Sequence, residues 1–305
     1  MISLRDIAYV RLNVSDLDAA AAFARHVIGL QPEGSTSGTR YFRSDSRSHS
    51  LALLAAPGGR AGDHVVAFDV DDTADLDSAS AALEAEGYKV RYGSTGDCDS
   101  RHVKAMVGFR DPSGNAIELV VRHAESGKQF IPQRDVDIRC FNHVGLWSTD
   151  TRRDEYFWTR VCNARVSDRI GDVPLMRINA IHHTIALAPA TSCGLHHINH
   201  QVGSTDDILR AAYFLREQGV PLVFGPGRHP TSGARFLYFR GPDNVVFEYS
   251  VGVDEIADEA SHRARQFNAE PWSLCQWGSL WDNGVGGNEP PSPPLQPVSL
   301  RMLGE

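Results

Sequence analysis

Apolar residues occur in this chain as short strand-like runs, several of which are followed by stretches with helical spacing. Residues 6–12 and 140–146 both have the composition of a strand. Each is followed by a stretch whose apolar positions fall on one face of a helix, over residues 16–28 and 151–161. The same succession of strand and helix is therefore expected twice, in two distant parts of the chain.

This succession belongs to a longer internal repeat. Tyr9 and His143 hold equivalent positions 134 residues apart, and His49 and His183 are separated by the same distance. The separation then falls in small steps. Residues 63–70 match residues 195–202 at a separation of 132 positions, and residues 111–118 match residues 241–248 at a separation of 130. A separation that changes slowly while the order is kept indicates a duplicated sequence with small deletions in its loops.

Each half of the chain contains the same unit twice. Two further helices, over residues 73–87 and 205–219, end at a glycine, which is a common way for a helix to stop. A tight turn with a proline precedes the last strand of each half. We therefore predict an α+β fold made of two domains, each with two βαβββ modules. The four modules are expected at residues 5–60, 61–125, 138–190 and 193–251.

The predicted domains follow from the modules. The amino-terminal domain spans residues 1–125, a polar linker spans 126–137, and the carboxy-terminal domain spans 138–251. The remaining residues 252–305 are expected to form a helix and a tail. In that part, the helix is predicted over residues 254–266, a Gly/Pro-rich stretch at 284–297 is expected to be extended, and three tryptophans are expected to pack onto the domain: Trp272, Trp277 and Trp281.

Composition excludes several classes of partner. The formal net charge of -8 argues against binding to nucleic acid or to an anionic membrane surface, since both require clustered cations. No apolar run reaches the roughly 18 residues that a membrane span needs, and the first residues lack the pattern of a signal peptide, so we expect a cytoplasmic protein. The five cysteines form no CxxC pair, whereas the 13 histidines include a cluster after residue 180. Histidine chemistry is therefore expected in the second half.

The histidines stand in recognisable motifs. The strand that opens the third module reads His-Val-Gly-Leu from His143, and the strand that opens the fourth contains the pair His196 and His197. Together with the four modules, these motifs resemble the type I extradiol ring-cleavage dioxygenases of the vicinal oxygen chelate superfamily, and the resemblance extends to about residue 250. It implies that His143, His197 and Glu248 bind a metal ion. Two imidazoles and one carboxylate would hold Fe(II) and leave positions open for a catechol and O₂.

Three more residues match the resemblance. His183 stands where that family has its acid–base histidine, in a strand that reads His-His-Thr-Ile-Ala-Leu. His229 ends a Gly-Arg-His motif, and Tyr238 follows nine residues later. The resemblance implies that Tyr238 hydrogen-bonds the deprotonated catechol oxygen, that His229 steadies the intermediate formed with oxygen, and that His183 takes up a catechol proton and later returns one.

The first half serves as an internal control. At the three ligand positions it has Tyr9, Val65 and Glu118, so two of the three ligands are missing. We expect this half to have the fold without the metal site and to play a structural role.

Each of these residues, taken singly, also has an ordinary structural explanation. A lone histidine on a strand is more often hydrogen-bonded than bound to metal. We expect such a role for His182, His196 and His200, which would point to the other face of their strand or lie beyond the site. Gly145, two residues after the first ligand, suggests a roomier pocket and hence a substituted catechol.

The combined interpretation is an Fe(II)-dependent extradiol dioxygenase, with Mn(II) as the alternative metal. Its substrates would be O₂ and a bicyclic, alkyl-bearing or carboxyl-bearing catechol from the breakdown of aromatic compounds, as for relatives that act on 2,3-dihydroxybiphenyl or 2,3-dihydroxy-p-cumate. The resemblance also implies a homo-oligomer. The sequence leaves open which catechol is used and on which side of the substituent the ring is cut.

Two alternatives fit the same modules. A glyoxalase-like isomerase would draw its metal ligands from both halves, and Tyr9 and Val65 argue against that arrangement. A non-catalytic binding protein of the same superfamily would lack the metal triad altogether.

Overall fold

The structure, a computed structural model, describes residues 1–36, 38–56 and 63–282. The order strand, helix and three strands occurs four times, which confirms the predicted α+β fold of βαβββ modules. The elements of the first half are β1 (Ile7–Val14), α1 (Leu17–Phe23) with a π-helical turn η1 (Ala24–Ile28), β2 (Gln31–Thr36), β3 (Thr39–Arg43), β4 (Leu51–Ala55), β5 (His64–Val70), α2 (Thr73–Ala85), β6 (Arg91–Tyr92), α3 (Thr95–Asp99), β7 (Ala105–Arg110) and β8 (Ala116–Val121).

The second half repeats this order without a helix equivalent to α3 and then adds two short elements. Its elements are β9 (Ile138–Ser148), α4 (Thr151–Tyr156) with a π-helical turn η3 (Phe157–Val161), β10 (Arg165–Ile170), β11 (Val173–Arg177), β12 (Ile185–Pro189), β13 (Gly194–Val202), α5 (Thr205–Glu217), β14 (Leu222–Arg228), β15 (Arg235–Arg240), the 3₁₀ turn η4 (Pro242–Asn244), β16 (Val246–Val251), β17 (Arg265–Phe267) and α6 (Pro271–Leu274).

All four predicted helices of the modules are present, and short polar side chains begin them. Asp16, Asp72, Asp150 and Ser204 each accept a hydrogen bond from a backbone N–H in the first turn of the helix that follows. Gly87 and Gly219, just after α2 and α5, have φ angles of 84° and 66°. A side chain would be strained in this left-handed conformation, so glycine ends these helices.

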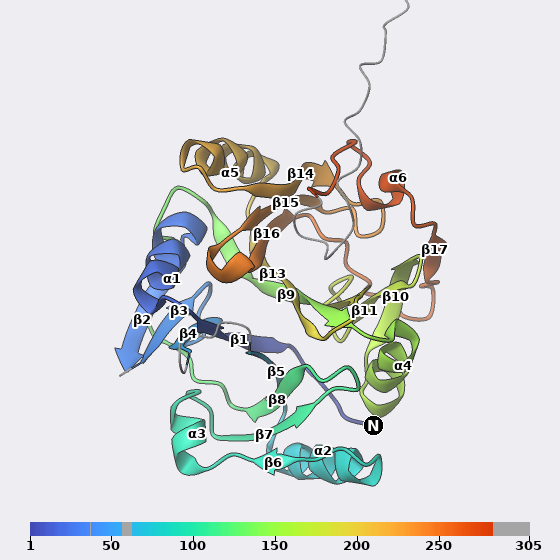
Figure 1. The fold of residues 1–305 in the computed structure, drawn as a ribbon. Coiled ribbons are helices and arrows are strands. Elements are labelled where there is room, and N and C mark those ends of the chain that lie inside the picture. The colour runs from blue at the N-terminus through green and yellow to red at the C-terminus, as the bar shows by residue number, and fades with distance from the viewer. Residues whose placement is uncertain (37, 57–62, 283–305) are drawn as a thin grey trace, which may run out of the picture.

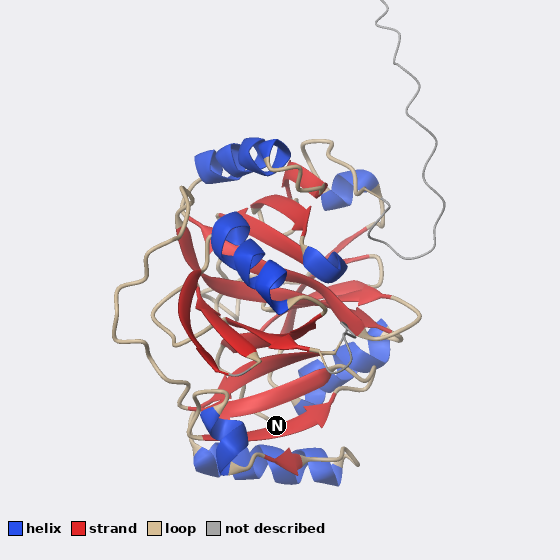
Figure 2. Ribbon diagram, turned by 60° about the vertical axis from the view of Figure 1, so that its left-hand side comes forward, coloured by secondary structure: helices blue, strands red, loops and turns tan. Residues whose placement is uncertain are grey.

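The strands form two mixed sheets, one for each half (Figures 1 and 2). The first has the order β2-β3-β4-β1-β5-β8-β7-β6, and the second has the order β14-β15-β16-β13-β9-β12-β11-β10-β17. In each sheet the opening strands of the two modules lie side by side and antiparallel, as β1 with β5 and as β9 with β13. The first strand of every module therefore lies in the middle of a sheet, where its side chains are buried.

Helical segments of each half pack against the other half. The ring of Phe23, at the end of α1, lies 5.9 Å from that of Phe247 on β16, measured between centroids. In the opposite direction Trp158, in η3, lies 5.4 Å from Phe68 on β5. These residues belong to one apolar core that includes side chains of both sheets. The two halves are thus held together by burial of apolar surface.

The segment after β16 differs from the prediction. The helix expected over residues 254–266 is absent. Backbone groups at the start of this stretch hydrogen-bond to neighbouring segments of the chain instead of to one another, so no helix begins there. The backbone N–H groups of Asp254 and Ile256 donate to the carbonyls of Ser232 and Ala180. The tryptophan prediction is also partly wrong: Trp272 and Trp277 are 56% and 50% exposed.

Trp281 does pack inward, where its ring stacks on Phe224 at 4.6 Å between centroids. The Gly/Pro-rich stretch predicted at residues 284–297 lies outside the described residues. Among the residues described, no helix has the length and apolar character needed to cross a membrane.

Candidate metal centre

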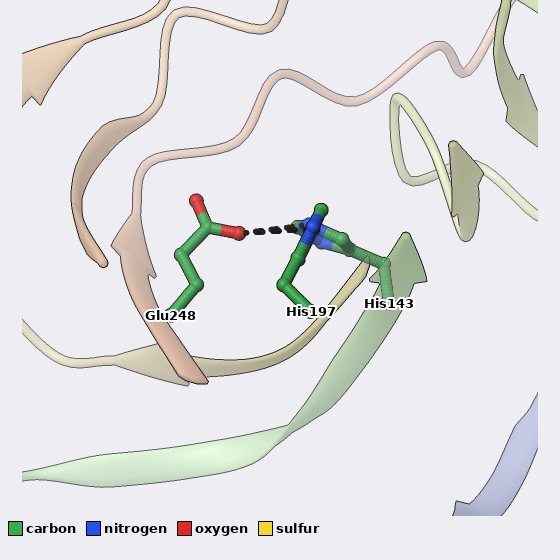
Figure 3. Close-up of side chains that lie close together, drawn as sticks. All are labelled: His143, His197 and Glu248. Carbon is green, nitrogen blue, oxygen red and sulfur yellow. Dashed lines mark hydrogen bonds and ion pairs between the residues drawn. The ribbon is translucent and has the colours of Figure 1, made fainter. Parts of the chain in front are cut away.

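Three buried side chains from neighbouring strands converge on one point (Figure 3). His143 lies on β9, His197 on β13 and Glu248 on β16, and their candidate ligand atoms are all within 4.8 Å of one another. The Oε2 atom of Glu248 is 3.0 Å from Nε2 of His143 and 3.4 Å from Nε2 of His197. The side chains of all three are 6% exposed or less. The structure therefore brings together the three residues that were predicted to bind metal.

Neighbouring side chains orient both imidazoles in the same way. Nδ1 of His143 is 2.8 Å from the amide oxygen of Asn142, which can only accept, so this nitrogen carries the proton. Nδ1 of His197 is 2.6 Å from Nδ1 of His196. In both ligands Nε2 remains free to face the glutamate, which is the usual way that an outer hydrogen bond orients a metal-binding histidine.

The free nitrogen of His197 fits a metal ion. Its Nε2 atom is buried and has no hydrogen-bond partner, which is costly in a metal-free interior. A divalent cation would satisfy this nitrogen and Nε2 of His143 together with the carboxylate, and two imidazoles with one carboxylate suit Fe(II). The donor set and the orphaned nitrogen together match a divalent transition metal.

The site also favours the protonation states that a metal requires. Burial alone would raise the pKa of Glu248, but the neighbouring imidazoles, His143 above all, hold it well below its ordinary value. Burial, with a smaller contribution from His196, lowers the pKa of His197 well below its ordinary value. An ionised carboxylate and a neutral imidazole are the forms that bind metal.

Gly145 makes room for the second ligand. A Cβ atom at this position would lie 2.4 Å from Nδ1 of His197, a distance that no real contact adopts. The two residues are paired across β9 and β13, where the register shifts between Leu195 and His197. Gly145 also lines a cavity beside the triad, which is described below. The space that it leaves next to β13, however, is filled by the imidazole of His197. The prediction that this glycine widens the substrate pocket is thus only part of its explanation.

The three other predicted residues surround the triad. The ring of His183 lies 4.2 Å from that of His143 between centroids. Tyr238 is directly opposite Glu248 in the pairing of β15 and β16, and its hydroxyl is 3.3 Å from Nε2 of His229. Nδ1 of His229 donates to the carbonyl of Leu274 at 2.7 Å. All three line the same cavity, so the structure brings together all six residues singled out in the sequence.

This cavity has a volume of about 220 Å³ and a predominantly apolar wall. The wall is contributed by β10, β11, β12, β14 and the segment after β16. Its apolar side chains are Ile170, Val173, Leu175, Ala186, Ala188, Phe224, Leu274 and Trp281. Among the described residues that line it there is no lysine, arginine, aspartate or glutamate.

His196 was expected on the other face of its strand, and the structure corrects this expectation. The register shift of β13 between Leu195 and His197 is a β-bulge, so consecutive residues no longer alternate strictly between the two faces. His196 therefore lines the cavity as well, against Trp147 and Trp281, with ring centroids at 4.3 and 5.5 Å. A bulge depends on the pairing of distant strands, and no local signal in the sequence revealed it.

The other two neighbouring histidines remain outside the cavity wall. His200 is buried, and burial lowers its pKa to about 3. His182 is 2% exposed and hydrogen-bonds both His183 and Asp168. Asp168 was not singled out in the sequence, since β10 brings it to His182 only in the folded sheet.

The first half has the same strand register with different side chains. Tyr9, Ala67 and Glu118 form one row across β1, β5 and β8, just as His143, Asn199 and Glu248 do across β9, β13 and β16. Glu118 accepts hydrogen bonds from the Tyr9 hydroxyl at 2.8 Å and from the Arg101 guanidinium at 2.6 to 2.8 Å. A guanidinium thus supplies the positive charge beside this glutamate.

Comparison with known proteins agrees with the fold. The family described as Glyoxalase/Bleomycin resistance protein/Dioxygenase superfamily matches residues 6–119 and 141–249. The iron-dependent extradiol dioxygenase of Rhodococcus jostii (strain RHA1) is 24% identical over 305 residues, covering 93% of this chain and 99% of the relative. The biphenyl-2,3-diol 1,2-dioxygenase of Metapseudomonas furukawaii is 28% identical over 265 residues, covering 81% and 86%.

A solved structure extends the comparison to three dimensions. The Mn(II)-bound glyoxalase from Novosphingobium aromaticivorans superposes with a TM-score of 0.84 at 28% identity, covering 96% of this chain and 97% of the other. The similarity thus extends over both halves.

Proposed function

The chain belongs to the Glyoxalase/Bleomycin resistance protein/Dioxygenase superfamily, and on this basis we propose that it is an extradiol dioxygenase that opens an uncharged, substituted catechol with O₂. The observation that carries the proposal is the buried triad of His143, His197 and Glu248 at the end of an apolar cavity. The names of the dioxygenase relatives support the same class of reaction.

Fe(II) is the proposed cofactor and Mn(II) the alternative, since a relative is named iron-dependent and a similar structure holds Mn(II). His143, His197 and Glu248 would hold the ion. When bound, it would act as a Lewis acid toward the two catechol oxygens and provide a place for O₂ beside them.

The protein's own groups would handle the protons. His183, whose pKa burial and the neighbouring His143 lower well below the ordinary value, is neutral and can accept a proton from a catechol hydroxyl. Tyr238 stays protonated, because burial and the charge of Glu248 raise its pKa well above the ordinary value. Its O–H group can therefore donate a hydrogen bond to the deprotonated catechol oxygen. Nδ1 of His229 donates a hydrogen bond to the carbonyl of Leu274. In the absence of substrate, its Nε2 accepts a hydrogen bond from the Tyr238 hydroxyl.

The cavity wall indicates the class of substrate. Phe224 and Trp281 offer flat apolar surfaces, and Ile170 and Leu175 add aliphatic ones. A carboxylate on the substrate would lose its hydration there and gain no cationic partner from the described lining residues. We therefore favour an aryl- or alkyl-substituted catechol over the carboxyl-bearing one that the sequence left open.

A glyoxalase activity is the main rival, because one similar structure bears that name. In this chain, however, the candidate ligand atoms all come from the second half. The equivalent row of the first half offers a glutamate already neutralised by Arg101 and Tyr9.

Oxygen uptake by the Fe(II)-loaded protein tests the proposal. We expect uptake and a coloured ring-opened product with biphenyl-2,3-diol or 3-methylcatechol, and at least tenfold lower kcat/KM with 3,4-dihydroxyphenylacetate. Glu248→Ala is the matched control without the carboxylate ligand. An absence of uptake with every catechol, or isomerisation of the methylglyoxal–glutathione adduct instead, would contradict the proposal.

We also propose that the protein is a cytoplasmic homo-oligomer, as the resemblance implies. Light scattering of the purified chain would measure its mass in solution, and a monomer of 33.5 kDa would contradict the oligomer.

A further inference from the structure

A row of three buried, hydrogen-bonded side chains leads from β10 to the cavity. Nε2 of His182 lies 3.0 Å from Oδ2 of Asp168, and Nδ1 of His182 lies 3.1 Å from Nδ1 of His183. Asp168, His182 and His183 are 0%, 2% and 6% exposed. Of the three, only His183 lines the cavity.

Arg265, on β17, fixes the far end of this row. Its backbone N–H and its Nε donate to Oδ1 of Asp168 at 2.8 and 3.1 Å, and its Nη2 donates to Oδ2 at 2.6 Å. Burial alone would raise the pKa of Asp168, but the hydrogen bonds from His182 and Arg265 lower it, so the carboxyl is ionised. Oδ1 is thus committed to Arg265, and Oδ2 is shared between Arg265 and His182.

The proton positions follow from what each group can do. A carboxylate only accepts hydrogen bonds, so Nε2 of His182 carries a proton. Arg265 already balances the charge of Asp168, so His182 can be neutral, and its Nδ1 then has a lone pair. This lone pair accepts the proton of His183 Nδ1, and the other nitrogen of His183, Nε2, is left unprotonated.

We propose that Asp168 is a positioning residue which, through His182, holds His183 in the tautomer whose Nε2 can accept a proton from the substrate. The role of the row in catalysis rests on the proposed function, whereas the tautomers themselves do not. A histidine held in the wrong tautomer would be a hydrogen-bond donor at Nε2 and could not act as a base.

The substitution Asp168→Asn tests this row because Arg265 dictates how the amide must lie. Two Arg265 donors, the backbone N–H and Nε, need an acceptor at the position of Oδ1, whereas only Nη2, which also donates to the Thr231 carbonyl, points at Oδ2. The amide oxygen therefore takes the place of Oδ1. The amide NH₂ then faces His182 and donates to its Nε2. His182 must carry its proton on Nδ1 and donate to His183, whose own proton moves to Nε2.

The tautomers can be read without metal or substrate. Two-bond ¹H–¹⁵N spectra of the full-length, metal-free, ¹⁵N-histidine-labelled chain distinguish Nδ1–H from Nε2–H rings. We expect His183 to be the Nδ1–H form in the wild type and the Nε2–H form in Asp168→Asn. The matched control is Asp154→Asn, since Asp154 is an equally buried carboxylate of the same half and lies outside the cavity wall.

Activity gives the second measurement. With Fe(II) content equal to that of the wild type, we expect Asp168→Asn to lower kcat/KM by about 100-fold or more, the usual contribution of a general base. Asp154→Asn should stay within threefold of the wild type. His182→Phe keeps an aromatic ring in place but removes the hydrogen-bond acceptor for His183, so it should lower kcat/KM to a similar degree. This variant replaces Asp168→Asn in the test if Asp168→Asn fails to fold.

The outcomes separate the two proposals. If the wild type cleaves catechols while Asp168→Asn keeps both the wild-type tautomers and the wild-type activity, the row has no positioning role. If the wild-type spectra show His183 protonated at Nε2, the tautomer assignment is wrong. A wild type with the expected tautomers that cleaves no catechol contradicts the proposed function and, with it, the role of the row in catalysis.

Discussion

Both halves of the molecule bury a glutamate at the same place in the same strand register. In the second half Glu248 faces the imidazoles of His143 and His197, and Nε2 of His197 has no hydrogen-bond partner. In the first half Glu118 is hydrogen-bonded by Tyr9 and paired with Arg101. The carboxylate is thus retained in both halves, and the source of the positive charge differs.

This difference shows what a buried carboxylate requires. Removed from water, it is stable only beside a cation or several hydrogen-bond donors. A guanidinium and a phenol satisfy Glu118 completely with side chains of the protein. Two imidazoles, each hydrogen-bonded through Nδ1, leave the second half in need of an external cation.

The largest effect is expected from breaking the triad. Glu248→Ala or His143→Ala removes a ligand and should abolish both stoichiometric metal binding and ring cleavage, by more than about 10³-fold in kcat/KM. Metal analysis and oxygen uptake measure the two effects. Tyr9→Phe, at the position equivalent to His143, is the control and should leave both unchanged. Full activity in His143→Ala would contradict the assignment of this ligand.

Removing the guanidinium tests the first half in the same way. Arg101→Met leaves Glu118 as an uncompensated buried charge and should lower the free energy of unfolding by about 3–5 kcal/mol. Urea denaturation measures this loss, and the metal content should not change. The double variant with Glu118→Gln should recover part of the stability. Equal stability of wild type and Arg101→Met would show that the buried Glu118 does not need the charge of Arg101, and the comparison of this ion pair with a metal site would be wrong.

A smaller effect is expected from closing the space beside the second ligand. Gly145→Ala places a methyl group against the ring of His197 and should weaken metal affinity by about 10- to 100-fold, since the imidazole must shift. Titration with Fe(II) under anaerobic conditions measures the affinity. Gly108→Ala on β7 is the matched control, because its added Cβ would meet no heavy atom closer than 3.9 Å.

The smallest effect concerns pH and compares the buried His200 of the second half with the half-buried His123 of the first. Burial lowers the pKa of His200 and of His123 to about 3. The folded chain keeps these rings neutral, while the unfolded chain protonates them below about 6.5, so stability falls as the pH falls below that value. His200→Leu or His123→Leu should flatten the pH dependence of the unfolding free energy of the metal-free chain by up to about 1.4 kcal/mol per pH unit. An unchanged slope would mean that the ring is charged in the folded state.

Much of the fold was accessible from the sequence because it is repeated. The matched positions of Tyr9 with His143 and of Glu118 with Glu248 defined four modules, and local patterns located all four module helices. The prediction of a helix over residues 254–266 was wrong. The backbone N–H groups at the start of this segment donate to the carbonyls of Ser232 and Ala180, which are distant in sequence, instead of forming helical hydrogen bonds.

The sequence by itself determined the modules, because motif order and strand position are local properties that a duplication makes visible. The candidate triad and the three residues around it followed from the resemblance to extradiol dioxygenases. Only the tertiary structure decided that His196 faces the cavity, that Arg101 takes the place of a cation beside Glu118, and that Asp168 reaches His183 through His182. These contacts depend on register shifts and on pairing between strands far apart in the chain. The apolar wall of the cavity was hidden for the same reason, since its side chains come from separate strands and from Trp281 beyond the last module.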